Sequence, residues 1–286
     1  MASLREIRRK IKSVKSTQQI TKAMKMVAAA RLRKAQARIL SARPFAQKME
    51  ELMTDLLIKI GHDQEHPLFK HREGQRRALL LVTSDRGLCG AFNTNLIRET
   101  LKYLTKHGAQ NVDLFIVGRK GRDYFRRLGS HLSKDYVNIA NAVTFAHAEL
   151  ILGDLLQGYQ AQPWVAVDLL YNEFKSVIQQ KLVIKTLLPL TPIEPVETRP
   201  WPDFLYEPAK EELLEAIIQR FLKSQVFRVL LESSAAELGA RMAAMDNATR
   251  NAAELMSSLT LTMNRTRQAS ITKEILEVVS GAEALK

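Results

Sequence analysis

The chain has 286 residues, of which 43 are basic and 30 acidic, so its formal net charge is +13. Hydrophobic residues make up 46% of it, which is enough for a packed core and excludes a wholly disordered chain. Its single cysteine excludes a disulfide framework and any zinc site built from cysteines. The longest apolar runs fall far short of the ~20 residues that a membrane-spanning helix needs, so we expect no such helix.

Residues 1–60 hold most of the positive charge. They carry 15 basic and 4 acidic side chains, and no acidic residue lies between Glu6 and Glu50. A segment with this charge should bind an acidic partner, which could be nucleic acid phosphate, anionic lipid or an acidic protein surface. Composition alone does not choose among the three.

The same 60 residues have the periodicity of a long helix. Apolar residues recur from Leu4 to Ile60 at alternating steps of three and four, which predicts a coiled-coil seam. Pro44 lies inside this pattern and is expected to kink or interrupt the helix, because proline lacks the donor for the helical hydrogen bond. Three seam positions are polar, and nearby apolar residues are expected to shift the stripe around the helix there: the polar positions are Gln18, Thr21 and Lys25, and the apolar ones Ile20, Met24 and Val27.

Residues 209–286 predict a second long helix. Positions that step by four and three from Leu231 to Thr266 are apolar in nine of eleven cases, and the segment contains no proline. Each helix is too long for a globule, so the two should pack together as an antiparallel coiled coil. The C-terminal helix is the longer one, and its last turns should project beyond its partner.

Residues 78–190 alternate between strand and helix patterns. Strands are expected at 78–85, 112–118, 164–174 and 181–190, and the last two are close enough for a hairpin. The fold predicted is therefore a small Rossmann-like α/β domain with a mainly parallel sheet, inserted between the two coiled-coil helices. Residues 61–77 and the proline-rich residues 191–208 are expected to be linkers.

Two glycine-containing turns could bind ligands, but a structural role is favoured for both. SDRGLCGAFN (84–93) lies where an α/β sheet would hold a phosphate, yet it contains neither GxGxxG nor GxxxxGK[ST]. GRKG (118–121) is a weak sign of nucleic-acid contact when it stands alone. A tight strand-to-helix turn explains each of them.

No catalytic, cofactor or metal site is recognisable. His62, His66 and His71 are close in sequence, but without cysteines or dense carboxylates a solvated loop is the better interpretation. Cys89 has no nucleophilic setting and should pack in the core. We therefore expect a chain without an active site, a cofactor or a bound metal.

Charged and amide side chains lie beside the C-terminal seam at Arg265, Arg267 and Gln268, where they could face solvent or reach acceptors on an enclosing partner. At these residues the chain closely resembles the gamma subunits of bacterial F-type ATP synthases. The resemblance covers nearly the whole chain. It is strongest in IRRKIKSVKSTQQITKAMKMVAAARLRKAQ (7–36), TSDRGLCGAFNTNL (83–96), ARMAAMDNATRNAAEL (240–255) and NRTRQASITKEILEVVSGAEAL (264–285).

The resemblance implies a rotor shaft inserted into a ring of three alpha and three beta subunits. Met24 and Lys25, with Arg267 and Gln268, would contact beta, although Lys25 stands where the family often has an acidic residue. The α/β domain would be a foot that binds the epsilon subunit and the membrane ring of c subunits, near Arg126 and Tyr206. Rotation of the shaft would couple ion flow to ATP synthesis and hydrolysis on beta.

The resemblance also implies a non-catalytic, peripheral subunit on the cytoplasmic face of the bacterial inner membrane, which reaches the membrane only through the c ring and binds no nucleic acid. Two alternatives remain from the residues alone. A nucleic-acid-binding protein would use the basic helix, but the chain lacks interleaved aromatic residues for base stacking. A nucleotide-dependent enzyme would need a phosphate loop, which is not found.

Overall fold

The computed structural model describes residues 3–60, 67–139, 142–176, 179–190 and 210–283. These residues form two compact units. One comprises Met1–Ala29 with Arg241–Lys286, and the other comprises Ala30–Ala240. We call the first the coil unit and the second the foot unit.

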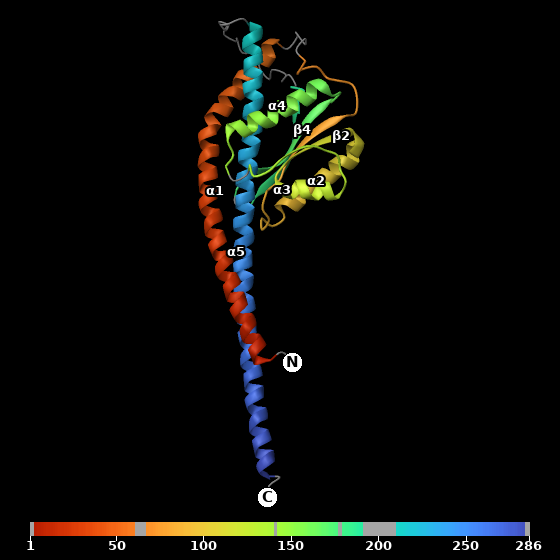
Figure 1. The fold of residues 1–286 in the computed structure, drawn as a ribbon. Coiled ribbons are helices and arrows are strands. Elements are labelled where there is room, and N and C mark those ends of the chain that lie inside the picture. The colour runs from red at the N-terminus through yellow and green to blue at the C-terminus, as the bar shows by residue number, and fades with distance from the viewer. Residues whose placement is uncertain (1–2, 61–66, 140–141, 177–178, 191–209, 284–286) are drawn as a thin grey trace. The chain divides into compact units, whose positions relative to one another are not determined.

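Two long helices run through the chain (Figure 1). Helix α1 spans Leu4–Ile60 and α5 spans Lys210–Glu283, which confirms the two helices predicted from periodicity. The buried side chains of α1 all fall on the predicted seam: Ile7, Thr21, Ala28, Leu32, Met49 and Met53. Of the two outcomes expected at Pro44, an interruption is wrong, because α1 continues through this residue, and the kink stays a prediction. Proline removes one helical hydrogen bond, and the buried Met49 and Met53 hold the turns that follow it.

The foot unit contains a five-stranded sheet. Its strands are β1 (Arg77–Val82), β2 (Val112–Val117), β3 (Leu132–Tyr136), β4 (Ala166–Phe174) and β5 (Gln180–Leu188), in the spatial order β3-β2-β1-β4-β5. The pairs β1 with β2, β2 with β3 and β1 with β4 are parallel. Strand β5 is antiparallel to β4, which confirms the hairpin and the mainly parallel sheet.

Strand β3 was not predicted. Its sequence, LSKDY, has two charged residues and only its last residue is buried. It is an edge strand, so no continuous apolar run was available to reveal it.

Helices cover both faces of the sheet (Figure 1). Helices α2 (Phe92–His107) and α3 (Arg119–Arg127) pack on one face, against Leu79 and Leu81 of β1. Helix α4 (Phe145–Ala161) packs on the other face with α5, against Leu80 and Val82. Successive side chains of β1 point to opposite faces of the sheet, so they belong to two separate hydrophobic cores. A short 3-10 helix, Ala109–Asn111, precedes β2.

Buried carboxylates join the strands of the sheet. Asp168 on β4 is 2% exposed and accepts hydrogen bonds from Arg77, Tyr103 and Thr186 at 3.0, 2.5 and 2.6 Å. Burial, and then the hydrogen bond to Asp168, raises the pKa of Tyr103 well above its usual value. Every donor comes from a different element, so this network fixes the sheet and helix α2 rather than forming an open site.

Candidate functional site

The coil unit pairs α1 and α5 in opposite directions through a polar stretch of the seam. The Thr21 and Thr249 hydroxyl oxygens lie 2.8 Å apart, and Lys25 Nζ donates to Asp246 Oδ1 at 2.5 Å. A step forward along α1 is therefore a step back along α5, as the predicted antiparallel pairing requires.

The predicted shift of the apolar stripe in this stretch is wrong. Ile20 and Val27 are 57% and 53% exposed, and Met24 is half-buried, whereas Thr21 is buried. The seam keeps its register because threonine and lysine find polar partners on α5, which removes the cost of burying them. The apolar residues Ile20 and Val27 are left facing outward.

Lys25 takes part in a three-residue charge cluster. Asp246 accepts from Lys25 and, through its other oxygen, from Arg250 at 2.7 Å. The hydrogen bond from Lys25 is the main reason that the pKa of Asp246 lies below its usual value. Asp246 was not predicted from the sequence, although its position next to the seam residue Met245 was the available signal. Lys25 is thus balanced within the chain itself.

Arg267 and Gln268 lie where the two-helix pairing ends. Continuing the register from Thr21 and Thr249 places Thr266 opposite Leu4, the first residue of α1. Both side chains are exposed, so their guanidinium and amide groups are available to acceptors outside the chain. This placement separates them along α5 from Met24 and Lys25, which lie opposite Asp246.

The last turns of α5 are helical, apolar and exposed. Every residue from 271 to 282 is exposed. Ile275, Leu276 and Val278 are 57%, 59% and 72% exposed, and Ile271 and Val279 are similar. Five large apolar side chains exposed within residues 271–279 are typical of a surface that another protein encloses.

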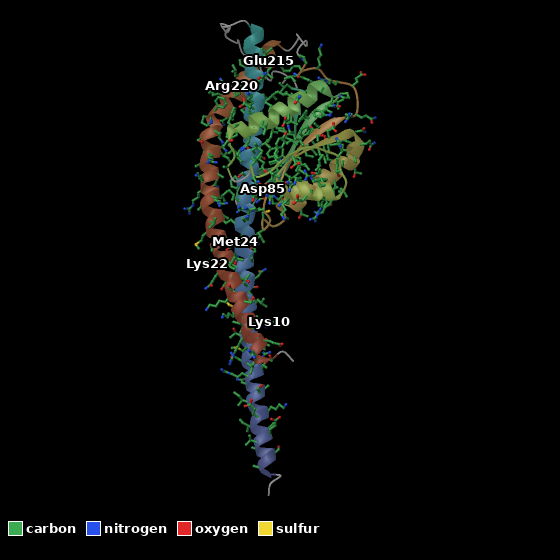
Figure 2. The ribbon with its side chains drawn as sticks, viewed as in Figure 1. Lys10, Lys22, Met24, Asp85, Glu215 and Arg220 are labelled. Atoms are coloured by element: carbon green, nitrogen blue, oxygen red, sulfur yellow. The ribbon has the colours of Figure 1, made fainter. Side chains whose placement is uncertain are left out.

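The outer face of α1 in the coil unit is strongly basic. Its exposed cations are Arg5, Arg8, Arg9, Lys10, Lys12, Lys15 and Lys22. Figure 2 labels Lys10, Lys22 and Met24 along this helix. These cations and the outward Ile20 and Val27 are all exposed along the same part of α1, which suits an acidic, partly apolar partner.

Of the two residues predicted to contact epsilon and the c ring, Arg126 is exposed on the foot unit. Arg126 lies in the last turn of α3, its side chain is 58% exposed, and it donates to Asp135 of β3 at 2.8 Å. Tyr206 lies outside the described residues. The predicted pairing of Arg126 and Tyr206 on one surface stays a prediction.

The turn after β1 is held by its own polar groups. The Ser84 hydroxyl donates to the Arg86 carbonyl at 2.6 Å, and the Ser84 N–H donates to Asn93 Oδ1 at 3.0 Å. Cys89 is buried beneath it, 2% exposed. In Figure 2 the label of Asp85 marks this turn on the foot unit. These bonds agree with a structural role for SDRGLCGAFN.

Helix α5 covers the carboxyl end of β1. Parallel sheets of this order bind ligands at the carboxyl ends of the strands on either side of the order reversal, here β1 and β4. On the side of β1 that faces β2, Leu230, Ser233 and Glu237 of α5 line a space of about 10 Å³ beyond the strand ends. That volume is too small for a nucleotide.

The GRKG turn has a packing explanation. Gly118 has φ +95°, and a Cβ there would lie 2.3 Å from the Thr83 carbonyl oxygen. A Cβ on Gly121 would lie 2.8 Å from the Thr83 hydroxyl, which accepts a hydrogen bond from the Gly121 N–H. Both glycines are needed for α3 to begin against β1, so the motif is no evidence for nucleic-acid contact.

No group of three potential metal-binding side chains occurs among the described residues. His71 is exposed, and His62 and His66 lie outside the described residues. The described helices include none that is both long and apolar enough to cross a membrane.

Comparisons with known proteins cover the whole architecture. Residues 3–285 match the family model described as ATP synthase. The chain is similar to the ATP synthase gamma chain of Anaeromyxobacter sp., at 47% identity over 290 residues, and to that of Geobacter metallireducens, at 43% over 288 residues. Both alignments cover all of both chains.

The chain is also similar to chains in solved structures of ATP synthases. A chain of the Tetrahymena thermophila mitochondrial ATP synthase central stalk and c-ring structure is 30% identical, with a TM-score of 0.60, covering 80% of this chain and 99% of that one. A chain of the Euglena gracilis mitochondrial ATP synthase structure is 22% identical, with a TM-score of 0.71, covering 99% and 94%, and it supports the fold alone.

Proposed function

The chain belongs to the ATP synthase gamma-chain family and is the central-stalk subunit of an F-type ATP synthase, and from this premise we propose how its surfaces do that work. The coil unit is the shaft inside a ring of alpha and beta subunits. The foot unit binds the epsilon subunit and the c ring. The rotating shaft transmits torque between the c ring and the beta subunits. It thereby couples ion flow through the c ring to ATP synthesis or hydrolysis on beta.

The observation that carries this proposal is the exposed apolar end of α5. Residues 271–282 are exposed at every position although Ile275, Leu276 and Val278 are among them. Exposure of these apolar side chains to water is unfavourable, so a partner must enclose them. A ring around the helix end encloses it on all sides, and its contacts must be weak enough to permit turning.

Contacts with beta are assigned to two places along the coil unit. Met24 and the exposed cations of α1 face an acidic beta segment, and Lys25 lies beside them with its charge balanced by Asp246. Arg267 and Gln268 reach a beta loop at the level where α1 begins. Arg126, and with it Tyr206, belongs to the foot surface for epsilon and the c ring.

The subunit itself is non-catalytic in this proposal, and it has no cofactor or metal site of its own. The space beyond the ends of β1 and β2 supports this, because α5 side chains line it and leave about 10 Å³. We place the subunit peripherally on the cytoplasmic face of the bacterial inner membrane. The division into residues 1–60, 61–77, 78–190, 191–208 and 209–286 is part of the same proposal. No comparison favours the nucleic-acid alternative.

Reconstitution tests the assigned contacts. The chain is combined with separately expressed alpha and beta subunits, and ATP hydrolysis is compared for the wild type, Arg267→Ala with Gln268→Ala, and the matched control Arg265→Ala. Arg265 is an exposed guanidinium on the same turns to which no contact is assigned.

We expect the double variant to assemble but to hydrolyse ATP several-fold more slowly, and the control to resemble the wild type. Equal rates in all three complexes would contradict the contacts of Arg267 and Gln268. Failure of the wild-type chain to assemble with alpha and beta would contradict the function itself.

A further inference from the structure

The foot unit contains a second cavity that the rotor function does not use. It lies between α1 and α5, with one wall completed by α4, and has a volume of about 370 Å³. That volume falls within the range of about 300–1,000 Å³ typical of small-molecule sites. Its lining includes three aromatic rings, Phe45, Phe145 and Phe227.

Aromatic rings form the walls of the cavity, as in many small-molecule binding sites. Phe145 of α4 and Phe227 of α5 meet edge to face, with ring centroids 5.6 Å apart. Phe45 and Phe145 are 50% and 42% exposed, so the rings can be reached from outside. Ile39 and Ala46 of α1 add aliphatic surface. Flat apolar ligands and cations both favour such surroundings.

A buried carboxylate supplies the polar end of the cavity. Glu232 is only 7% exposed, and its Oε1 accepts a hydrogen bond from Arg228 Nε at 2.8 Å. Its Oε2 is buried and has no hydrogen-bond partner among the described residues. An unpartnered buried carboxylate oxygen is costly, and a ligand with an N–H donor would remove that cost.

Glu232 sets the sign of the ligand locally. Arg228 lies between two acidic groups, with its Nη1 3.9 Å from Glu50 Oε2 and its Nε bonded to Glu232. Arg43 also lines the cavity, so the four charged lining side chains sum to zero. The unpartnered Glu232 Oε2 therefore decides the preference, because a cation can donate a hydrogen bond to it and an anion cannot.

We infer that this cavity is a binding site for a small aromatic monocation, whose ammonium donates to Glu232 and whose rings pack among Phe45, Phe145 and Phe227. The inference does not rest on the rotor function, since none of the residues that line the cavity is assigned a contact with another subunit. A ligand held there would join α1 to α5 and stabilise their packing in that unit.

Isothermal titration calorimetry on the full chain tests the inference with three probes of one shape. They are 4-phenylbenzylamine, which is cationic at pH 7, the neutral 4-phenylbenzyl alcohol and the anionic 4-phenylbenzoate. We expect the amine to bind at least tenfold more tightly than the carboxylate, with the alcohol between them. Equal affinities, or no binding by the amine, would overturn the assignment.

Two variants with matched controls locate the binding. Glu232→Gln should weaken the amine at least tenfold and leave the alcohol nearly unchanged, whereas Glu254→Gln, an exposed residue of α5, should change neither. Ala46→Phe fills the cavity and should weaken all three probes, whereas Ala37→Phe, exposed on α1, should not.

The circular dichroism melting curve of each variant shows whether it folds. Amine binding that survives both Glu232→Gln and Ala46→Phe would place the ligand elsewhere and refute the site. If Glu232→Gln does not fold, the Ala46→Phe and Ala37→Phe pair still decides the location.

Discussion

Two glycines on α4 allow the packing of the foot unit to be tested within one helix. A Cβ added at Gly158 would lie 2.2 Å from Cη2 of Trp164, whereas a Cβ at Gly153 meets nothing within 4 Å. Trp164 cannot easily move aside. It is 2% exposed, its indole N–H donates to Asp113 at 2.5 Å, and its ring meets Phe115 edge to face at 5.7 Å.

The expected energies follow from these surroundings. Alanine in place of a helical glycine stabilises by about 0.5–1 kcal/mol, which is all that Gly153→Ala should show. Gly158→Ala gains the same amount but overpacks a fixed indole, which costs about 1–3 kcal/mol. Because Trp164 is held on two sides, we expect the upper end of that range, and therefore a net loss of about 2 kcal/mol.

Urea unfolding followed by tryptophan fluorescence measures both variants. The chain has two tryptophans, so Trp201→Phe is introduced in every sample to leave Trp164 as the reporter of the foot unit. Gly153→Ala should raise the urea midpoint and Gly158→Ala should lower it. If Gly158→Ala were as stable as Gly153→Ala, the close packing of α4 on Trp164 would be refuted.

Three further outcomes are expected. Lys25→Asp and Asp246→Lys should each lower the thermal midpoint of the full chain by placing like charges together, and the double exchange should recover most of it; no recovery would show that the pair is not formed. His107 has a lowered pKa because of burial and then the nearby Arg77, so its folded form resists protonation. Stability should therefore fall as the pH drops below about 6.5, and melting curves of His107→Gln between pH 7.5 and 5.5 should show a smaller fall. Deleting residues 271–286 should leave the melting curve unchanged, since residues 271–282 are exposed, but should abolish hydrolysis in the reconstituted complex; intact hydrolysis would contradict the enclosed helix end.

Much of the fold could be predicted because its signals are local. The seam from Leu4 to Ile60 and the absence of proline after residue 209 predict both long helices, and four apolar runs predict four strands. Strand β3 was missed because an edge strand needs few apolar residues. The periodicity already included Met49 and Met53 beyond Pro44, but it could not show that burying them outweighs the hydrogen bond that proline removes.

The candidate contacts were less predictable because they depend on pairs far apart in sequence. Lys25 alone suggests an unbalanced charge, and only the antiparallel register brings Asp246 to it. The same register places Arg267 and Gln268 at the end of the two-helix pairing. The carboxylate of Glu232 has no motif around it, and its cavity exists only where three helices meet.

The central claim is that this chain turns inside its ring, and single-molecule rotation tests it most directly. Leu128→Cys gives an attachment point for a bead, since Leu128 is 55% exposed and the native Cys89 is only 2% exposed. With the alpha and beta ring fixed to a surface and ATP supplied, the bead should rotate in one direction with three equal steps per turn. A complex that hydrolyses ATP while the attached bead stays still would contradict the account.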